Sequence, residues 1–233
     1  MGFGQLGRPG MRLVLWDIDH TLISTRGVGR ELSAAAFLRV TGQPMREQAK
    51  IDGITEPVIF RETAKLHGLA TGRAEFESFA EALAEEHLAR SGELRERGHA
   101  LVGAAAAVEA LDSGGMTQTV VSGNVRAVSE IKLSVFGLDR HIRWELGAYG
   151  EDEDERAELV RLALERSGAS AADTVLIGDT PADVQAGLAN GVRVIAVATG
   201  NSGEDELRDC GPFAVLPDLS DTERLVMLVA EGA

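Results

Sequence analysis

The sequence predicts an α/β fold: an open, mostly parallel sheet combined with a separate helical region. Short apolar segments end in acidic or small polar residues, helical segments separate most of them, and one long stretch near the N-terminus has only helical patterns. Strands that alternate with helices in this way are typical of a sheet with helices on both faces. A chain of 233 residues has material for one sizeable core and a smaller second lobe.

The first expected strand covers residues 12–16, "RLVLW", which is apolar and stops abruptly at acidic residues. This pattern indicates a buried parallel strand that delivers side chains to its carboxyl end. A weaker segment of this kind is "HIRWELG" around Trp144. The other strands are expected in "TQTVVSG" around Val120, in "TVLIGD" at 174–179 and in "VRVIAVATG" at 192–200.

Helix boundaries in the second half of the chain are marked by proline and glycine. The segment "RAELVRLALERSG" ends at Gly168, and "PADVQAGLANG" begins at Pro181 and ends at Gly191. Proline is favoured in the first turn of a helix and glycine just after the last turn. The tail "AVLPDLSDTERLVMLV" adds one more short strand and a closing helix.

Residues 25–97 are expected to form a helical domain inserted into the sheet domain. The segments "GRELSAAAFLRVTG", "EPVIFRETAKLHG" and "RAEFESFAEALAEEHLARSG" each end near a glycine, as helices commonly do. The sheet domain then comprises residues 11–24 and 98–233, after a flexible leader at 1–10. We expect the insertion to act as a lid over the carboxyl ends of the strands, where ligands bind in such sheets.

Composition excludes several classes of partner. The formal charge of -14 disfavours binding to nucleic acid or to an anionic membrane, so an anionic ligand needs a local positive site. The sequence contains no apolar run of membrane-spanning length and no signal-peptide pattern, and a single cysteine, Cys210, fits a reducing compartment. We therefore expect a cytoplasmic protein, either a monomer or a homodimer.

Two pairs of carboxylates follow apolar strands. Asp17 and Asp19 flank Ile18, so strand alternation places both carboxylates on one side. Alone, this pair is also compatible with a simple strand-end turn. The second pair, Asp179 and Asp183 in "IGDTPADV", favours a functional interpretation, because clustered carboxylates at adjacent strand ends suit Mg²⁺.

Four motifs resemble those of the haloacid dehalogenase-like superfamily in order and setting. They are "WDIDHTL", "VVSGN", an arginine ahead of the fourth motif, and "IGDTPADV". The stretch "GDTPADVQAGLANG" is most similar to the phosphoglycolate phosphatase-like branch, and the helical insertion resembles the C1 cap of that superfamily. The resemblance implies a Rossmann-like core with a cap and a Mg²⁺-dependent phosphatase. Its substrate would be a small phosphorylated metabolite of the phosphoglycolate or sugar-phosphate type.

The resemblance assigns roles to the aspartates. Asp17 would attack phosphorus and form an aspartyl-phosphate, which divides one difficult displacement into two easier ones. Asp19 would protonate the leaving oxygen and then deprotonate the hydrolytic water. Asp17, Asp19 through its backbone carbonyl, and Asp179 would hold Mg²⁺, and Asp183 completes the set of acidic metal-site candidates.

Ser122 ends the strand "TQTVV" and resembles the hydroxyl of the second motif, which binds a phosphoryl oxygen. Considered alone, Ser122 followed by Gly123 is more typical of a turn. In the setting of the other motifs we favour phosphate binding, with Gly123 and Asn124 completing the pocket through backbone contacts.

The third motif normally supplies a cation, for which Arg156, Arg161 and Lys132 are candidates. Arg156 shares a helix face with apolar residues and is expected to point inward, whereas Arg161 groups with glutamates and is expected in solvent. We select Arg156, although relatives more often have lysine there. Its planar, permanently charged group suits phosphate.

Two further assignments stay open. His20 stands where many relatives have glycine, and it could narrow the entrance, titrate beside Asp19 or be a tolerated surface imidazole. The segment "DGITEP" at 52–57 resembles the specificity loop of C1 caps, so Thr55 or Arg61 is a candidate for substrate contact. An equal alternative is a loop that caps the helix starting near Glu56.

Other activities occur on the same scaffold. A dehalogenase has no leaving oxygen to protonate, and such relatives lack the second carboxylate of the first motif, so the presence of Asp19 argues against that activity. A sugar-phosphate mutase is the main alternative, because its cap must exclude water while the phosphoryl group is returned. A catalytically idle binding protein is a remote alternative, because every acidic motif position is present.

Overall fold

Five parallel strands form the centre of the molecule in the computed structural model, which describes residues 12–231. The leader expected at residues 1–10 lies outside the described residues. Every pair of neighbouring strands is parallel, so the predicted α/β fold class is confirmed. In spatial order the strands are β4 (Thr117–Val120), β1 (Leu13–Trp16), β5 (Thr174–Gly178), β6 (Arg193–Val197) and β7 (Ala214–Leu216).

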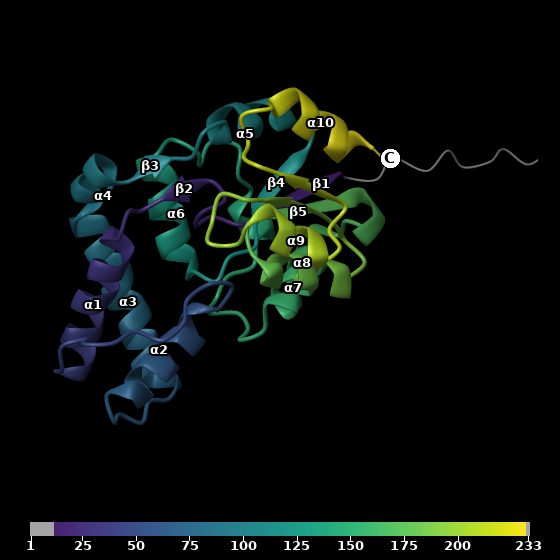
Figure 1. Cartoon of the computed structure of the whole chain (residues 1–233). Coiled ribbons are helices and arrows are strands. Elements are labelled where there is room, and N and C mark those ends of the chain that lie inside the picture. Colours follow the sequence, from purple (N-terminus) through teal and green to yellow (C-terminus); the bar gives the residue numbers. More distant parts are fainter. Residues whose placement is uncertain (1–11, 232–233) are drawn as a thin grey trace, which may run out of the picture.

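Strand alternation in β1 divides the sheet core into two layers (Figure 1). Val14 and Trp16 pack on one face with α5 (Ala104–Ser113) and α10 (Thr222–Ala230). Leu13 and Leu15 pack on the other face with helices of the second half of the chain. Those helices are α7 (Arg156–Ser167), α8 (Pro181–Ala189) and α9 (Glu204–Asp209).

The helix boundaries follow the local signals in the sequence. α7 ends before Gly168, which has a φ of 69° and adopts the left-handed conformation that glycine tolerates best. α8 begins with Pro181, and the side chain of Thr180 accepts a hydrogen bond from the backbone N–H of Asp183. This capping satisfies a donor that the first turn would otherwise leave unpaired.

The weak strand expected around Trp144 is wrong. Residues Trp144–Leu146 form a short 3₁₀ helix, η1, and the Gly147 N–H donates to the Trp144 carbonyl. The chain around this segment pairs with β4 and the residue that follows it only through two isolated bridges, Gln118 with Ile142 and Val121 with Ala148. A turn of helix between these bridges prevents a continuous ladder. A second such helix, η2, covers Ala171–Asp173.

The inserted region consists of helices, as the sequence predicts. These helices, which we call the helical layer, are α1 (Val28–Thr41), α2 (Glu56–Leu66), α3 (Arg73–Ala89) and α4 (Ser91–Arg97). The sequence predicts the third helix up to Gly92, whereas α3 ends at Ala89 and α4 follows as a separate helix that the sequence analysis does not predict. The layer has its own apolar core, which includes Phe37, Phe60 and Phe79.

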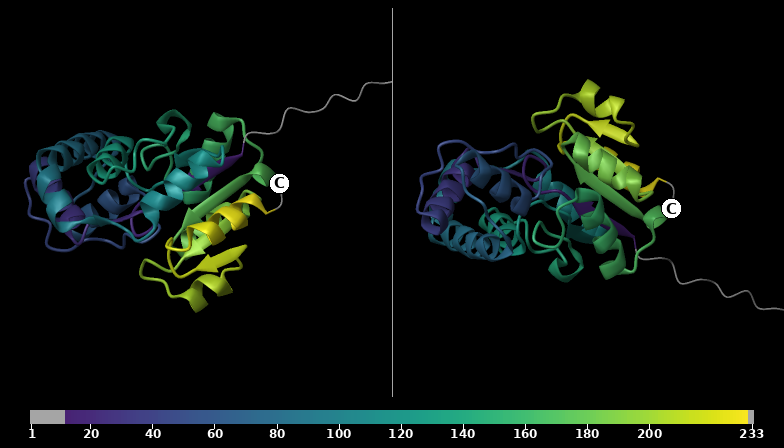
Figure 2. Two further views of the ribbon diagram at one scale, coloured as in Figure 1. Left: turned by 90° about the horizontal axis from the view of Figure 1, so that it is seen from above. Right: turned by 90° about the horizontal axis from the view of Figure 1, so that it is seen from below.

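The helical layer packs against α6 (Arg126–Val135) at one end of the sheet (Figure 2). Val125 and Val128 at the start of α6 belong to the apolar core of the layer. Two chain segments connect the layer to the sheet, and they pair as the antiparallel strands β2 (Ile23–Ser24) and β3 (His99–Ala100). The sequence did not reveal this two-residue ribbon, and the division into domains at residues 25–97 stays a prediction.

Across residues 12–231, no helix combines the length and the apolar character that crossing a membrane requires.

Candidate active site

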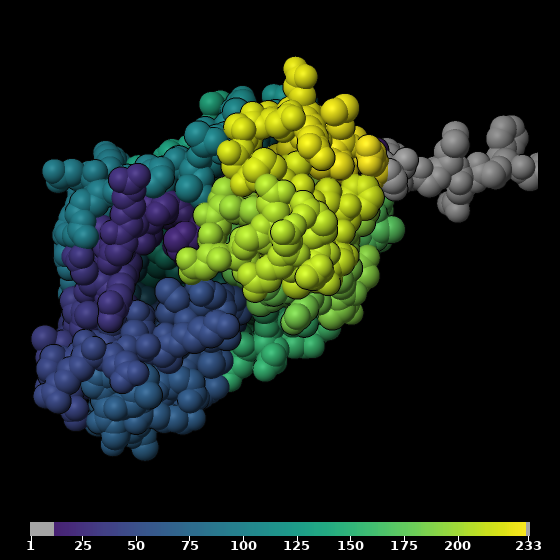
Figure 3. Space-filling model, viewed as in Figure 1, coloured from purple at the N-terminus to yellow at the C-terminus, as the bar shows by residue number. Residues whose placement is uncertain are grey.

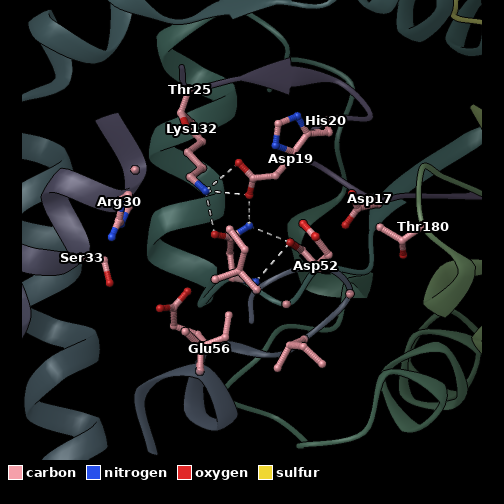
Figure 4. Close-up of a pocket in the computed structure, with 18 of the residues that line it drawn as sticks. Asp17, Asp19, His20, Thr25, Arg30, Ser33, Asp52, Glu56, Lys132 and Thr180 are labelled. Carbon is pink, nitrogen blue, oxygen red and sulfur yellow. Dashed lines mark hydrogen bonds and ion pairs between the residues drawn. The ribbon is translucent and has the colours of Figure 1, made fainter. Parts of the chain in front are cut away.

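The carboxyl ends of β1, β4 and β5 meet at one edge of the sheet. Asp17 directly follows β1, Asp179 directly follows β5, and Ser122 lies two residues beyond β4. The Asp17 N–H donates to the Ile177 carbonyl at 2.9 Å, which extends the β1–β5 pairing to the site. All three side chains line one cavity with residues of the helical layer (Figure 4), and Figure 3 shows a hollow between the two parts of the surface.

Three buried carboxylates cluster at this edge. One oxygen from each of Asp17, Asp179 and Asp183 lies within 4.8 Å of the others. The Thr21 hydroxyl lies 3.2 Å from Asp17 Oδ2 and 3.0 Å from Asp179 Oδ1, and its single proton can serve only one of them at a time. The Thr21 hydroxyl therefore cannot compensate the negative charge of both carboxylates.

Burial and neighbouring charge raise the pKa values of two carboxyls in the cluster, Asp17 and Asp179. Burial raises the pKa of Asp17 to about 7, although the charge of Arg156 opposes the rise. Burial, followed by the charges of Asp17 and Asp183, raises the pKa of Asp179 to about 9. A bound divalent cation would remove this repulsion, and oxygen ligands of this kind fit Mg²⁺.

Glycines allow the backbone to approach the cluster closely. A side chain at Gly200 would overlap the Asp179 carboxylate, and a side chain at Gly178 would overlap the carboxylate of Asp183. The loop after β6 therefore reaches the metal-site candidate only because residue 200 is glycine.

Arg156 lies at the start of α7 and is buried, as its helix face predicts. Its Nη2 atom contacts Asp17 Oδ1, and its Nε donates to Asp183 Oδ1 at 2.6 Å. The two carboxylates hold the pKa of Arg156 above its usual range even though burial opposes this. Arg161 lies at the surface as expected, since 42% of its side chain is exposed and it pairs with Glu158 and Glu165.

Asp183 belongs to the cluster but does not line the cavity. Its Oδ1 accepts from Arg156, and its Oδ2 accepts from the Thr180 hydroxyl at 2.6 Å and from the Thr180 N–H at 3.1 Å. Both carboxylate oxygens are already occupied. In this arrangement Asp183 positions Arg156 and caps α8, and its role as a metal ligand stays a prediction.

Asp19 points away from the acidic cluster toward Lys132 on α6 (Figure 4). Lys132 Nζ lies 2.7 and 2.9 Å from the two Asp19 oxygens, and Asn124 Nδ2 donates to Oδ2 at 2.7 Å. Burial opposes ionisation, but the Lys132 charge and these hydrogen bonds outweigh it and lower the pKa of Asp19. The side chain of Asp19 is thus not a metal ligand in this arrangement, which leaves only its backbone carbonyl for that role.

Lys132 was considered from the sequence only as a substitute for Arg156, and its contact with Asp19 was missed. A signal existed in the spacing: Val125, Val128 and Lys132 are three and four residues apart, so they share one helix face. That face is the buried face of α6. A lysine on a buried face requires a partner, which is here a carboxylate.

Ser122 begins a compact turn that faces the cavity. Its Oγ accepts from the Asn124 N–H at 3.2 Å and from Asn124 Nδ2 at 2.9 Å. The Gly123 carbonyl accepts from the Glu56 N–H at 2.8 Å, and a side chain at Gly123 would overlap the Ile54 carbonyl. The predicted phosphate pocket and the helical layer therefore touch through backbone at this point.

His20 has a φ of 63°, in the left-handed region that disfavours most residues. Glycine adopts this conformation without a steric cost, so a glycine would fit at this position. The His20 carbonyl accepts a hydrogen bond from the Thr199 hydroxyl, and the residue lines the cavity.

Thr55 is not among the residues that line the cavity, and its contact with substrate stays a prediction. Its buried hydroxyl donates to the Asp154 carbonyl at 3.0 Å, and Arg61 pairs with the Asp154 carboxylate at 3.0 Å. Both residues thus join the helical layer to the loop before α7. The neighbouring Glu56 lines the cavity instead, together with His87 from α3. Neither of these two was singled out from the sequence.

A comparison with known families decides the assignment. A family model described as haloacid dehalogenase-like hydrolase matches residues 14–197. The chain belongs to this hydrolase family. The match covers most of the chain and includes the segments that supply Asp17, Ser122 and Asp179. The expectations of family and of enzyme are thereby confirmed.

The individual proteins that this chain resembles are named as a nucleotidase, a hydrolase and a mutase. A protein of Pseudomonas aeruginosa named 5′-nucleotidase is 27% identical over 212 residues, which are 89% of this chain and 91% of that protein. A hydrolase from Pseudomonas syringae has a TM-score of 0.68 at 18% identity, covering 93% of this chain and 98% of the other. A Bacteroides vulgatus protein provisionally named β-phosphoglucomutase has a TM-score of 0.66 at 19% identity, covering 96% and 90%.

Proposed function

We propose that this hydrolase is a Mg²⁺-dependent phosphatase of small phosphorylated metabolites, of the phosphoglycolate or sugar-phosphate type. The observation that carries the proposal is the cluster in which buried Asp17 meets Asp179 and Arg156 beside the Lys132-bound Asp19. Phosphoryl transfer through an aspartyl-phosphate requires a nucleophile, a cation-binding pair, an arginine and an acid–base group.

Asp17 is the proposed nucleophile. A free carboxylate oxygen attacks phosphorus, the bond to the leaving oxygen breaks, and Asp17 carries the phosphoryl group until water releases it. Arg156 neutralises charge on Asp17 and on the phosphate, and its contact with Asp183 holds the guanidinium in place. The Ser122 hydroxyl and the N–H groups of the following turn bind phosphoryl oxygens.

Asp17, Asp179 and the Asp19 carbonyl are the proposed ligands of Mg²⁺. Bound there, the ion supplies the positive charge that lets an anionic nucleophile approach an anionic phosphate. The excess of carboxylate charge in the cluster supports this part of the proposal.

Asp19 is the proposed general acid and base. It donates a proton to the leaving oxygen and later accepts one from the hydrolytic water. Lys132 and Asn124 fix its carboxylate at the edge of the cavity, between the acidic cluster and the helical layer. Asp19 must take up a proton before it can act as the acid, and the approach of the phosphate anion favours that uptake.

The helical layer is proposed to act as the cap. Residues of α1, α2 and α3 line the same cavity as Asp17 and Asp19, so closure would surround the leaving group and exclude water. A nucleoside monophosphate is a further candidate substrate, since the Pseudomonas aeruginosa relative is named 5′-nucleotidase. A sugar-phosphate mutase is the alternative that the Bacteroides vulgatus neighbour favours.

The proposal is tested by phosphate release from an aryl phosphate and from a panel of metabolite phosphates, with Mg²⁺ and with a chelator. We expect release only with the metal, and loss of release in Asp17→Asn. The exposed Asp205 provides a matched control, because Asp205→Asn makes the same change away from the site. A mutase would show net sugar-phosphate isomerisation that outpaces phosphate release. An Asp17→Asn protein of undiminished activity would refute the assignment.

A further inference from the structure

His87 on α3 is buried, and only 2% of its surface is exposed. Its Nδ1 lies 2.8 Å from the Leu83 carbonyl. A carbonyl can only accept a hydrogen bond, so Nδ1 carries the proton and Nε2 presents a lone pair. Burial, with the nearby Lys132 charge, lowers the pKa of His87 to about 4, so the ring is neutral at physiological pH.

The Nε2 atom of His87 is the one buried side-chain nitrogen or oxygen without a hydrogen-bond partner in the part of the chain that the structure describes. His67 at the end of α2 makes a useful comparison. It also bonds its Nδ1 to a carbonyl four residues earlier, but its Nε2 accepts from the Arg46 N–H at 2.9 Å. Leaving a buried acceptor unpaired costs about 1–3 kcal/mol, so a partner from outside the chain is expected.

The partner would occupy the cavity over the phosphate site. His87 lines this cavity, whose volume is about 170 Å³, whereas one water needs only about 15 Å³. The space beside His87 is therefore large enough for water in the free protein and for part of a ligand that replaces it. The cavity also contains Asp17 and Asp19, so a phosphoryl group at the acidic cluster would direct its leaving group toward the helical layer.

Glu56 at the start of α2 supplies a second acceptor to the same space. It is 9% exposed, and its carboxylate points into the cavity (Figure 4). Burial raises the pKa of Glu56 to about 7, although the charge of Lys132 opposes the rise. The Ser33 hydroxyl of α1 also faces this part of the cavity.

Positive charge is scarce in this half of the cavity. Lys132 is matched by Asp19 and also donates to Asn124 at 2.8 Å. Arg30 lines the cavity but is exposed, so solvent screens its charge. An anionic leaving group would meet Glu56 and the lone pair of His87, whereas a group with hydroxyl donors would satisfy both.

We propose that His87 and Glu56 form a leaving-group subsite for hydroxyl-bearing substrates, which favours sugar or nucleoside phosphates over phosphoglycolate. The inference rests on the proposed phosphatase function for the position of the phosphoryl group. His87 Nε2 accepts a hydrogen bond from one hydroxyl, and the Glu56 carboxyl accepts from a second. The two residues select the substrate and take no part in the displacement at phosphorus.

The test measures binding, so it does not depend on turnover. Calorimetric titration of the Asp17→Asn protein with Mg²⁺ would compare ribose 5-phosphate, glucose 6-phosphate and AMP with phosphoglycolate and inorganic phosphate. At least one hydroxyl-bearing ligand should bind more tightly than phosphoglycolate. Adding His87→Phe should weaken the binding of that ligand by about tenfold, whereas the affinity for inorganic phosphate should change less than about twofold.

Two further variants separate selection from structure. His87→Gln keeps an acceptor and should restore part of the lost affinity, while His67→Phe changes a histidine whose Nε2 is already paired and should have no effect. The proposal would be overturned if phosphoglycolate bound more tightly than every hydroxyl-bearing ligand, or if none of the three hydroxyl-bearing ligands bound. It would also be overturned if His87→Phe weakened the binding of all ligands equally. Wild-type turnover is measured separately: fast hydrolysis of phosphoglycolate alone sustains the phosphatase function and refutes this subsite.

Discussion

The stability of the Glu56→Gln protein relative to wild type should be greater at alkaline pH than at acidic pH. Burial raises the pKa of Glu56 to about 7 from its ordinary value of 4.5. The folded state therefore holds a proton that the unfolded state releases between these values, and wild-type stability falls as pH rises through this window. Glutamine keeps the shape of the side chain without an ionisable group.

The difference of about 2.5 pKa units corresponds to roughly 3 kcal/mol in the free energy of unfolding. The assay is urea unfolding of both proteins at about pH 5 and about pH 8, and the change in their stability difference should be about 2–3 kcal/mol. Glu47→Gln, at an exposed position, is the control and should show no such change. A stability difference for Glu56→Gln that is equal at both pH values would refute the reasoning.

The remaining predictions concern other parts of the site. His87→Phe should flatten the acid loss of stability between about pH 6.5 and 4, because the depressed pKa makes protonation of His87 oppose folding; urea unfolding across that window measures it. Arg156→Met should cost about 3–5 kcal/mol in chemical denaturation, because it leaves buried carboxylates unpaired. Gly200→Ala should weaken Mg²⁺ binding in calorimetry by displacing Asp179, and unchanged affinity would contradict this. His20→Val should lower the thermal midpoint and His20→Gly should not, because a left-handed backbone costs about 1–2 kcal/mol outside glycine.

Local signals were sufficient for most of the fold. The strand β1 is apolar on both faces because helices cover both, and this produces the continuous run that the sequence shows. The boundaries of α7 and α8 depend on Gly168 and Pro181, whose effects act within a few residues. The positions of Asp17 and Asp179 follow directly, because each comes immediately after a predicted strand.

The features that the sequence does not predict concern contacts between distant segments. The segment around Trp144 has the composition of a strand, but its neighbours in space let it pair only at two isolated bridges. Thr55 lies in the right loop, yet its hydroxyl is bound by the Asp154 carbonyl, 99 residues away in the chain. The spacing along α6 indicates only that Lys132 is on the buried face, and its partner Asp19 lies 113 positions away, so no local pattern identifies the partner.

The most direct test of the central claim is detection of a phosphoryl group on Asp17. The protein is mixed with Mg²⁺ and a substrate found by the phosphate-release panel, quenched in acid during turnover, and digested for peptide mass mapping. The account predicts one phosphorylated peptide, which contains Asp17 and is absent from the Asp17→Asn protein. Turnover without a phosphorylated peptide, or a phosphoryl group on another residue, would contradict the account.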